Sequence, residues 1–327
     1  MSGPIICGVD GSEQSLAAAM VAAQLSQRLG SRLLLAQVLE SPTGVPEGHE
    51  LQAERRWRRA GGRASSRFER VARRLGGVEV GRRVLHGPPA QALPALAADE
   101  DAALLVLGSR GRGALRAALL GSVSSAVVRA SDRPVVIVAP EAAHAGDPDG
   151  RDRLTVVCGI DDSDQAKVVA RVAARLAGVL ELVLVHAYPP GPSAAAIPAP
   201  GVAPPIDQEA RDERQRYGAR RLLEEVVRDL EDPPTRVRVE LGSAASALDR
   251  CAQEEDAELI VVGAHGRGPL ASFLLGSTSA RLAASASTPV VIVPPGACLP
   301  FARAGDVTRP TASSGPAAAT GSRRTSR

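Results

Sequence analysis

The chain has 327 residues, which is long for one domain and enough for two. Hydrophobic residues make up 44% and charged residues 23%, the balance of an ordinary water-soluble globular protein, and the 2% of aromatic residues argues against a surface that stacks nucleic-acid bases. The formal net charge is +3, but residues 297–327 carry five Arg against one Asp, so the rest of the chain has a net charge of −1. The charge therefore gives no indication of a nucleic-acid partner.

Cysteine usage and apolar runs indicate the compartment. The four cysteines form no CxxC pair and have no His nearby at metal-ligand spacing: Cys7, Cys158, Cys251 and Cys298. We therefore expect buried thiols, with neither a disulfide framework nor a zinc site. A secretory signal is not expected, and no apolar run approaches the ~18 residues that span a membrane. The sequence predicts a cytoplasmic protein without a membrane partner.

Predicted elements of the first copy of a repeat alternate between strand and helix. Strands are expected over 5–9 and 32–38, with a helix over 13–29 between them that Ser12 caps. An Arg-rich amphipathic helix then ends near Leu75, with these residues facing inward: Leu51, Ala60, Phe68, Val71 and Leu75. A strand over 78–85 and a short helix to Ala98 follow, in which Pro94 either kinks the helix or marks its first turn.

The copy ends with a strand over 104–107, a helix over 122–130 and a strand over 134–138. Such alternation predicts an α/β fold with a mostly parallel sheet and helices on both faces. A second copy repeats this order. Its loop over 188–206, rich in Pro and Ala, is either flexible or covers a site.

The duplication is visible in the sequence itself. IICGVDGS at 5–12 matches VVCGIDDS at 156–163, and PVVIV at 134–138 recurs at 289–293. We predict two copies of one domain, over 1–140 and 153–296, joined by a polar linker over 141–152. The tail over 297–327 is expected to be disordered, because its Ala, Ser, Thr, Arg and Pro composition cannot build a core.

A glycine motif follows the fourth strand of each copy. Two residues separate its first two glycines and nine separate the next pair, in Gly108, Gly111, Gly121-Ser122 and in Gly263, Gly266, Gly276-Ser277. Glycine lets the backbone approach a ligand and adopt φ > 0 without steric cost, and a helix that begins after such a loop offers free N–H groups and a partial positive charge. The motif therefore predicts a nucleotide phosphate cradle in each copy.

Asp10 and Asp161 end the first strand of each copy. Ligands of doubly wound sheets bind beyond the carboxyl ends of the strands, where the strand order reverses. If the first and fourth strands are neighbours there, each Asp and its glycine loop face one crevice, with the carboxylate at ribose or base. The alternative for Asp10 is that it only caps the turn before the first helix. Ser122 and Ser277 would bond phosphate while capping their helices, with Ser124 and Ser279 in the same first turn.

Three loop arginines, Arg110, Arg112 and Arg267, would either reach phosphate or face solvent, and His265 replaces Arg110 in the second copy. Other templates are missing from the sequence, which has neither a GxxxxGK[ST] stretch nor a GxSxG elbow. The sole lysine is Lys167, on the first helix of the second copy, and no general base is common to both copies. We assign no catalytic residue and no metal ligand.

With these residues assembled, the chain resembles the universal stress protein family in its tandem two-domain form, over about 3–140 and 153–295. The family's ATP-binding signature, G-2x-G-9x-G-[ST], is intact in both copies. The resemblance implies two tandem, open-twisted five-stranded parallel sheets of order 3-2-1-4-5, similar to adenine nucleotide alpha hydrolases. It also implies an intramolecular pseudo-dimer through the fifth strands, with a homodimer as a further option.

The resemblance implies ATP as the ligand, with or without Mg²⁺. Adenine would meet the backbone near Val38 and Ala187. The adenosine side would be lined by Gly8, Val9, Asp10, Gly159, Ile160 and Asp161. Leu107 and Val262 would precede the phosphate loops, and phosphates would be held by Ser122, Val123, Ser124, Ser277, Thr278 and Ser279. Asp162, where the first copy has Gly11, adds a carboxylate that would weaken ATP affinity in the second copy.

The function implied by this resemblance is that of a stress-response regulator that acts through nucleotide-dependent conformation or through protein partners not named by the sequence. The alternative is a slow ATPase, or another nucleotide hydrolase or adenylyl-transfer enzyme on the same fold. A third reading is a partner-docking module with empty sites. Nucleotide that co-purifies with the protein would separate the third reading from the first.

Overall fold

The structure is a computed structural model that describes residues 3–39, 62, 66–111, 120–144, 155–178, 181–190, 208–230, 235–266 and 275–297. The first half contains β1 (Ile5–Gly8), α1 (Glu13–Arg28), β2 (Leu33–Leu39), a helical segment over 66–74, β3 (Val80–His86), α3 (Pro89–Asp99), β4 (Leu104–Gly108), α4 (Ser122–Ala130), β5 (Val135–Val138) and the 3-10 helix η1 (Glu141–His144). The second half contains β6 (Val156–Gly159), α5 (Ala166–Ala177), β7 (Leu182–Tyr188), α6 (Gln208–Arg228), β8 (Thr235–Leu241), α7 (Ala244–Glu254), β9 (Leu259–Gly263), α8 (Ser277–Ser285) and β10 (Val290–Val293). The alternation predicted from the sequence is confirmed.

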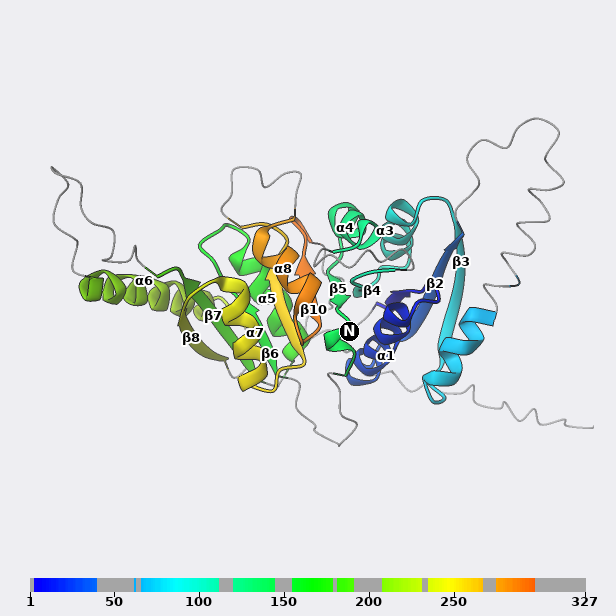
Figure 1. Ribbon diagram of the computed structural model, residues 1–327, viewed down its shortest axis with the longest axis horizontal. Helices are drawn as coiled ribbons and strands as arrows, with labels where there is room; N and C mark the ends of the chain where they lie inside the picture. The colour runs from blue at the N-terminus through cyan, green and yellow to red at the C-terminus, as the bar shows by residue number, and fades with distance from the viewer. Residues whose placement is uncertain are drawn as a thin grey trace, which may run out of the picture.

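The strands form one ten-stranded sheet of order β3-β2-β1-β4-β5-β10-β9-β6-β7-β8 (Figure 1). Each half is parallel and has the predicted order 3-2-1-4-5. The two sheets are not separate, however, because β5 and β10 pair antiparallel with Val136 opposite Val291. The result is a single mixed sheet and an intramolecular pseudo-dimer through the fifth strands, as the resemblance implied.

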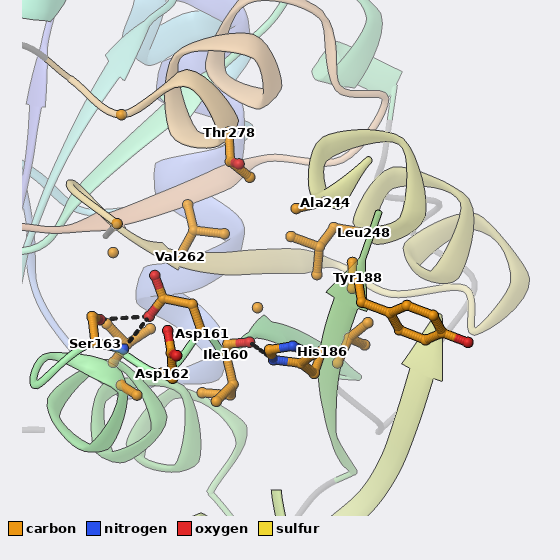
Figure 2. A pocket seen from close by; sticks show the side chains of 18 of the residues that line it. Ile160, Asp161, Asp162, Ser163, His186, Tyr188, Ala244, Leu248, Val262 and Thr278 are labelled. Atoms are coloured by element: carbon orange, nitrogen blue, oxygen red, sulfur yellow. Dashed lines mark hydrogen bonds between the residues drawn. The ribbon is translucent and has the colours of Figure 1, made fainter. Parts of the chain in front are cut away.

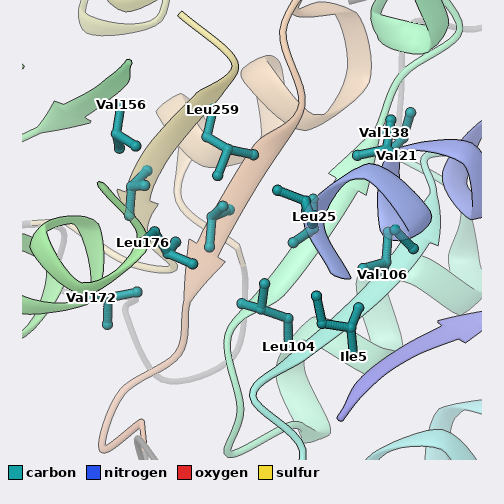
Figure 3. Packing of buried hydrophobic residues seen from close by; sticks show 14 of the residues in the cluster. Ile5, Val21, Leu25, Leu104, Val106, Val138, Val156, Val172, Leu176 and Leu259 are labelled. Carbon is teal, nitrogen blue, oxygen red and sulfur yellow. The ribbon is translucent and has the colours of Figure 1, made fainter. Parts of the chain in front are cut away.

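Two apolar clusters cover the two faces of the sheet. One holds residues of α1, α5 and α6, and the other holds residues of α3, α4, α7 and α8. Each cluster contains residues of both halves, and Figure 3 shows Leu25 of the first half and Leu176 of the second on the same face. Because burial of apolar surface is the main stabilising contribution, the halves share one core and are expected to stabilise each other.

Local sequence signals explain several element boundaries. Ser12 caps α1 by accepting a hydrogen bond from the Ser15 amide, as predicted. Pro94 lies inside α3, where Pro89 already occupies the first turn. Of the predicted inward residues, Phe68, Val71 and Leu75 are buried, whereas Leu51 and Ala60 lie outside the described residues, as does most of the loop over 188–206.

Candidate functional site

A cavity of about 780 Å³ opens at the carboxyl ends of β6, β7 and β9 (Figure 2). Strand β6 lies between β7 and β9, so this is the point at which the strand order reverses, where α/β sheets bind ligands. All eleven candidate residues of the second copy line this cavity: Gly159, Ile160, Asp161, Ala187, Val262, Gly263, Gly266, Gly276, Ser277, Thr278 and Ser279. The structure therefore brings together the residues that the sequence and the resemblance selected.

The glycine loops are pulled tightly against the helices that follow them. The Gly276 amide donates to the carbonyl oxygen of Ala264 at 2.8 Å, and a Cβ on Gly276 would lie 3.2 Å from that oxygen. In the first half the Gly121 amide donates to Ser109 at 2.8 Å, and a Cβ would lie 3.0 Å from that carbonyl oxygen. None of the six motif glycines has a positive φ. A side chain at Gly121 or Gly276 is disfavoured by this close approach to another backbone segment, whereas the positive φ that the sequence also suggested for the motif glycines is not found.

The N-termini of α4 and α8 carry no side-chain cap. Their N-cap residues are Gly121 and Gly276. Ser122 and Ser277 are the first helical residues, so the expectation that these serines cap the helices is wrong. By contrast, Ser12 and Ser243 cap α1 and α7 through their hydroxyl groups. The N–H groups in the first turn of a helix have no hydrogen-bond partner within that helix. At α8 these groups face a cavity, where an anion can accept hydrogen bonds from them.

Ser124 and Ser279 are buried and hold these helices in place. The Ser124 hydroxyl donates to the carbonyl oxygen of Gly108 at 2.8 Å. The Ser279 hydroxyl lies 3.1 Å from the carbonyl oxygen of Ala264 and 3.0 Å from that of Gly276. Since a hydroxyl has one proton, the described contacts commit it to the protein backbone. Their predicted contact with phosphate stays a prediction.

Asp10 and Asp161 each contact both the turn and the glycine loop. One oxygen of Asp10 accepts from the Ser12 amide at 2.9 Å and from the Ser12 hydroxyl at 2.6 Å, which is the turn-capping role. Asp161 accepts from the amide and hydroxyl of Ser163 in the same way. The second carboxylate oxygen of Asp10, Oδ2, lies 2.9 Å from the position that a Cβ on Gly111 would take. In the second half, Oδ2 of Asp161 lies 3.0 Å from the position of a Cβ on Gly266. The two readings of these carboxylates are therefore compatible.

Several residues that line the cavity were not selected from the sequence. His186 and Tyr188 come from β7 beside Ala187, and Ala244 and Leu248 come from α7 (Figure 2). The Nδ1 atom of His186 lies 2.8 Å from the carbonyl oxygen of Ile160. Residues of α6 complete the wall: Gln215, Gly218, Ala219 and Leu222. Helical periodicity tells which face of α6 turns inward, but it does not tell how far along the sheet that helix lies.

The eleven candidates of the first half take the corresponding places in β1, β2, β4 and α4 and in the turns that follow β1 and β4: Gly8, Val9, Asp10, Val38, Leu107, Gly108, Gly111, Gly121, Ser122, Val123 and Ser124. Gln37 stands where the second half has His186, in the strand pairs β1–β2 and β6–β7. Arg110 lies against the other half, where it donates to the carbonyl oxygen of Ala284. Arg112 and Arg267 lie outside the part of the chain that the structure describes.

The cysteines that the structure describes are not placed for metal binding or redox chemistry. Cys7, Cys158 and Cys251 are buried free thiols, and burial raises the pKa of each, that of Cys251 to about 11. Cys298 is not among the described residues. Within the described ranges, no group of three or more His, Cys, Asp or Glu side chains is placed to hold a metal ion. No helix in those ranges has the length and apolar character needed to cross a bilayer.

The fold and the glycine loops define a tandem doubly wound α/β protein with a candidate anion-binding cavity. A family model described as the universal stress protein family matches residues 1–139 and 153–294. The chain belongs to the universal stress protein family.

Individual relatives extend this result. Universal stress protein Rv1996 of Mycobacterium tuberculosis is 33% identical over 310 residues, which cover 88% of this chain and 94% of that protein. A universal stress protein of Mycolicibacterium smegmatis is 36% identical over 204 residues, 61% of this chain, and the match spans only 64% of that relative's length. The crystal structure of a universal stress protein from Archaeoglobus fulgidus covers 89% of this chain and 96% of its own, with a TM-score of 0.54 and 21% identity, a likeness that shows the fold.

Proposed function

We propose that this universal stress protein binds ATP in the cavity of its second half and at the matching place in its first half. The observation that carries the proposal is the N-terminus of α8, which has no side-chain cap and opens into a cavity of about 780 Å³ beside a glycine loop. A triphosphate there would accept hydrogen bonds from first-turn amides and interact favourably with the helix dipole.

The remaining groups fit the rest of a nucleotide. Ala187 lines the cavity at the end of β7, where its backbone carbonyl and amide would pair with an adenine edge. Asp161 stands between the strand end and the loop, where its carboxylate can accept from a ribose hydroxyl. Mg²⁺ commonly takes one or two carboxylates plus phosphate oxygens and waters, so the absence of a three-ligand cluster in the described residues is compatible with Mg²⁺ arriving with ATP.

The biological role that we propose is that of a cytoplasmic stress-response regulator, in which ATP occupancy changes conformation or partner binding. Its domains would be residues 1–140 and 153–296, with 141–152 as linker and 297–327 as a tail; residues 145–152 and 298–327 lie outside the described part of the chain. No histidine takes the same place in both copies of the sequence, which favours a binding function over rapid hydrolysis. The alternative is a slow ATPase, or another hydrolase or adenylyl-transfer enzyme. This alternative requires that each protein molecule converts more than one nucleotide to product and does not only hold ATP.

The structure also decides which variants test ATP binding. A methyl group on Gly108 would lie 3.0 Å from backbone atoms of Gln14 in α1, so Gly108→Ala disturbs the fold as well as the site. Ser122 and Ser277 are better positions, because an acidic residue in the first turn of a helix favours the helix while it repels phosphate.

We therefore compare the double variant Ser122→Asp/Ser277→Asp with Ser122→Asn/Ser277→Asn, which has nearly the same shape without the charge. Mass spectrometry of released nucleotide and calorimetric titration with ATP measure occupancy and Kd. We expect the Asp variant to bind ATP at least about tenfold more weakly than the Asn variant, while its melting temperature does not fall. Equal Kd values for the two variants, or no ATP binding by the unmodified protein, would refute the proposal.

A further inference from the structure

Helix α8 connects the candidate sites of the two halves. It begins after Gly276 in the glycine loop of the second half and ends nine residues later at Ser285. At that end, Arg110 from the glycine loop of the first half donates from Nη2 to the carbonyl oxygen of Ala284 at 3.4 Å. A cation at a helix C-terminus stabilises the helix through its dipole and the free carbonyl groups. One site therefore supplies a stabilising group to the helix whose other end forms the second site.

Arg110 belongs to the first site by its backbone. It lies between Gly108 and Gly111, and a Cβ on Gly121 would stand 3.4 Å from its Cα. Its side chain is incompletely satisfied, because the Nε atom is buried without a hydrogen-bond partner among the described residues and the bond from Nη2 to Ala284 is long. A guanidinium prefers short, charge-assisted hydrogen bonds to phosphate over one long bond to a carbonyl group.

The second half mirrors this arrangement. His265 takes the place of Arg110, and it faces Val128, Arg129 and Ser131 across a cavity of about 220 Å³ between the halves. Val128 and Arg129 lie in the last turn of α4, the helix that begins at the first site, and Ser131 is its C-cap. Each helix thus starts at its own glycine loop and ends against the glycine loop of the other half.

We propose that Arg110 couples the two nucleotide sites by exchanging its hydrogen bond. This inference rests on the proposed ATP binding. When ATP fills the first site, its phosphates take the guanidinium from Ala284 and leave the C-terminal turn of α8 less ordered. The N-terminus of this short helix then holds phosphate less well, so ATP in the first site lowers ATP affinity in the second. Coupling between two binding equilibria is reciprocal, so ATP in the second site lowers affinity in the first by the same factor.

The test uses the full chain and calorimetric titration with ATP. Gly111→Asp and Gly266→Asp each place a carboxylate in one loop, beside Asp10 and Asp161 respectively, and so leave one working site whose Kd can be measured alone. We expect the two-site titration of the unmodified protein to require a coupling factor of about fivefold or more relative to these Kd values. The factor should fall to one when Arg110→Ala is added to all three proteins. Arg281→Ala, which removes an exposed charge from the same helix, is the matched control and should keep the coupling.

Hydrogen exchange provides a readout that needs no change at Arg110. In the Gly266→Asp protein, ATP can fill only the first site, and we expect amides of the last turn of α8 to exchange severalfold faster when it does. Independent sites, a positive coupling, or unchanged exchange would overturn the coupling while leaving ATP binding intact. A protein that binds no ATP at either site would overturn both proposals.

Discussion

The Ser124 hydroxyl donates a 2.8 Å hydrogen bond to the carbonyl oxygen of Gly108, across sixteen residues of chain. In the second half Ser279 makes a similar bond, but its acceptor is the carbonyl oxygen of Ala264, one residue beyond the position equivalent to Gly108. Both serines are buried, and each joins the first turn of a helix either to the last residue of a strand (Gly108) or to the residue directly after one (Ala264). These bonds set the spacing between the glycine loop and the helix N-terminus, and therefore the width of the proposed phosphate cradle.

Removing the hydrogen bond from Ser124 to Gly108 should lower the stability of the fold. Ser124→Ala leaves the buried carbonyl oxygen of Gly108 without its donor, and we expect the free energy of unfolding to fall by about 1–2 kcal/mol. Ser125→Ala, on the same helix and not fully buried, should change it by less than about 0.5 kcal/mol. Urea unfolding followed by circular dichroism measures both. If both variants lost the same free energy of unfolding, the bond from Ser124 to Gly108 would contribute no more than any other serine hydroxyl on α4.

The pairing of β5 with β10 predicts the behaviour of half the chain. All four residues of β5 have 0% exposure, and their outer neighbour is β10 of the other half. A chain of residues 1–144 would present this apolar strand as a free edge, which readily pairs with another strand. We expect such a chain to form a homodimer through β5, detectable by light scattering after size-exclusion chromatography. Val136→Lys should convert the dimer to monomer, and a wild-type half that stays monomeric at high concentration would contradict this expectation.

Much of this architecture was predictable because its signals are local. Helix α4 begins and ends at the predicted residues 122 and 130, since a glycine loop precedes it and a short polar turn separates it from the next apolar strand. The repeat of IICG and VVCG placed β1 and β6 without any knowledge of their neighbours. The strand order came from the family resemblance, not from these patterns.

Other features depend on contacts between distant residues and were not predictable. The position of Ser122 in the motif suggested that it is the N-cap of α4. In the structure Gly121 is the N-cap, one residue earlier, and its amide donates a hydrogen bond to the carbonyl oxygen of Ser109. The sequence did not decide whether Arg110 contacts phosphate or faces solvent. In the structure its guanidinium donates a hydrogen bond to a carbonyl oxygen 174 residues away in the chain. Such a contact follows from the antiparallel docking of β5 on β10, and no local pattern carries that information.

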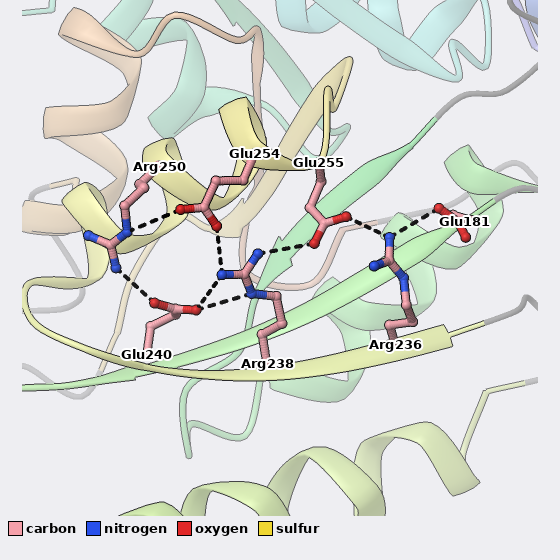
Figure 4. A network of polar contacts seen from close by, with 7 residues as sticks. All are labelled: Glu181, Arg236, Arg238, Glu240, Arg250, Glu254 and Glu255. Atoms are coloured by element: carbon pink, nitrogen blue, oxygen red, sulfur yellow. Dashed lines mark hydrogen bonds and ion pairs between the residues drawn. The ribbon is translucent and has the colours of Figure 1, made fainter.

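A network of ion pairs crosses the outer strand β8 and the end of α7 (Figure 4). Arg238 lies at its centre, with contacts of 2.7 Å to Glu240, 2.7 Å to Glu254 and 3.0 Å to Glu255. Burial opposes ionisation of Glu240 and Glu255, but hydrogen bonds from arginines outweigh it and hold the pKa of both carboxyl groups below the usual value. The carboxylates are therefore favoured in the folded state.

The direction of these shifts fixes a pH dependence. A carboxyl group with a lowered pKa in the folded state stabilises the fold above its unfolded pKa of about 4.3, and this contribution is lost as the pH falls through the folded value. We expect Arg238→Met to lower the free energy of unfolding by about 1–2 kcal/mol at neutral pH, and by progressively less as the pH falls through the lowered folded pKa values of these carboxyl groups. Arg221→Met, which loses only an exposed pair with Glu225, is the control. A loss that is independent of pH would mean that packing, not charge, explains the effect.

Cys251 lies on α7 beside this network of ion pairs. The rate at which its thiol is alkylated reports how often α7 opens from the sheet. Its side chain is fully buried, and burial, supported by the nearby Glu255, Glu240 and Glu254 against the opposing Arg238, raises its pKa to about 11. Only the thiolate reacts with iodoacetamide, so at about pH 8 its reactive fraction is roughly 200-fold smaller than that of an exposed thiol with a pKa of about 8.5. We expect peptide mass spectrometry to show Cys251 alkylated at least about 200-fold faster in urea than in the folded protein. Cys7 and Cys158 should be protected in the same way, because burial raises the pKa of both. If Cys251 alone reacted in the folded protein as fast as in urea, α7 would have to open from the sheet far more often than its packing in the apolar cluster on this face of the sheet allows.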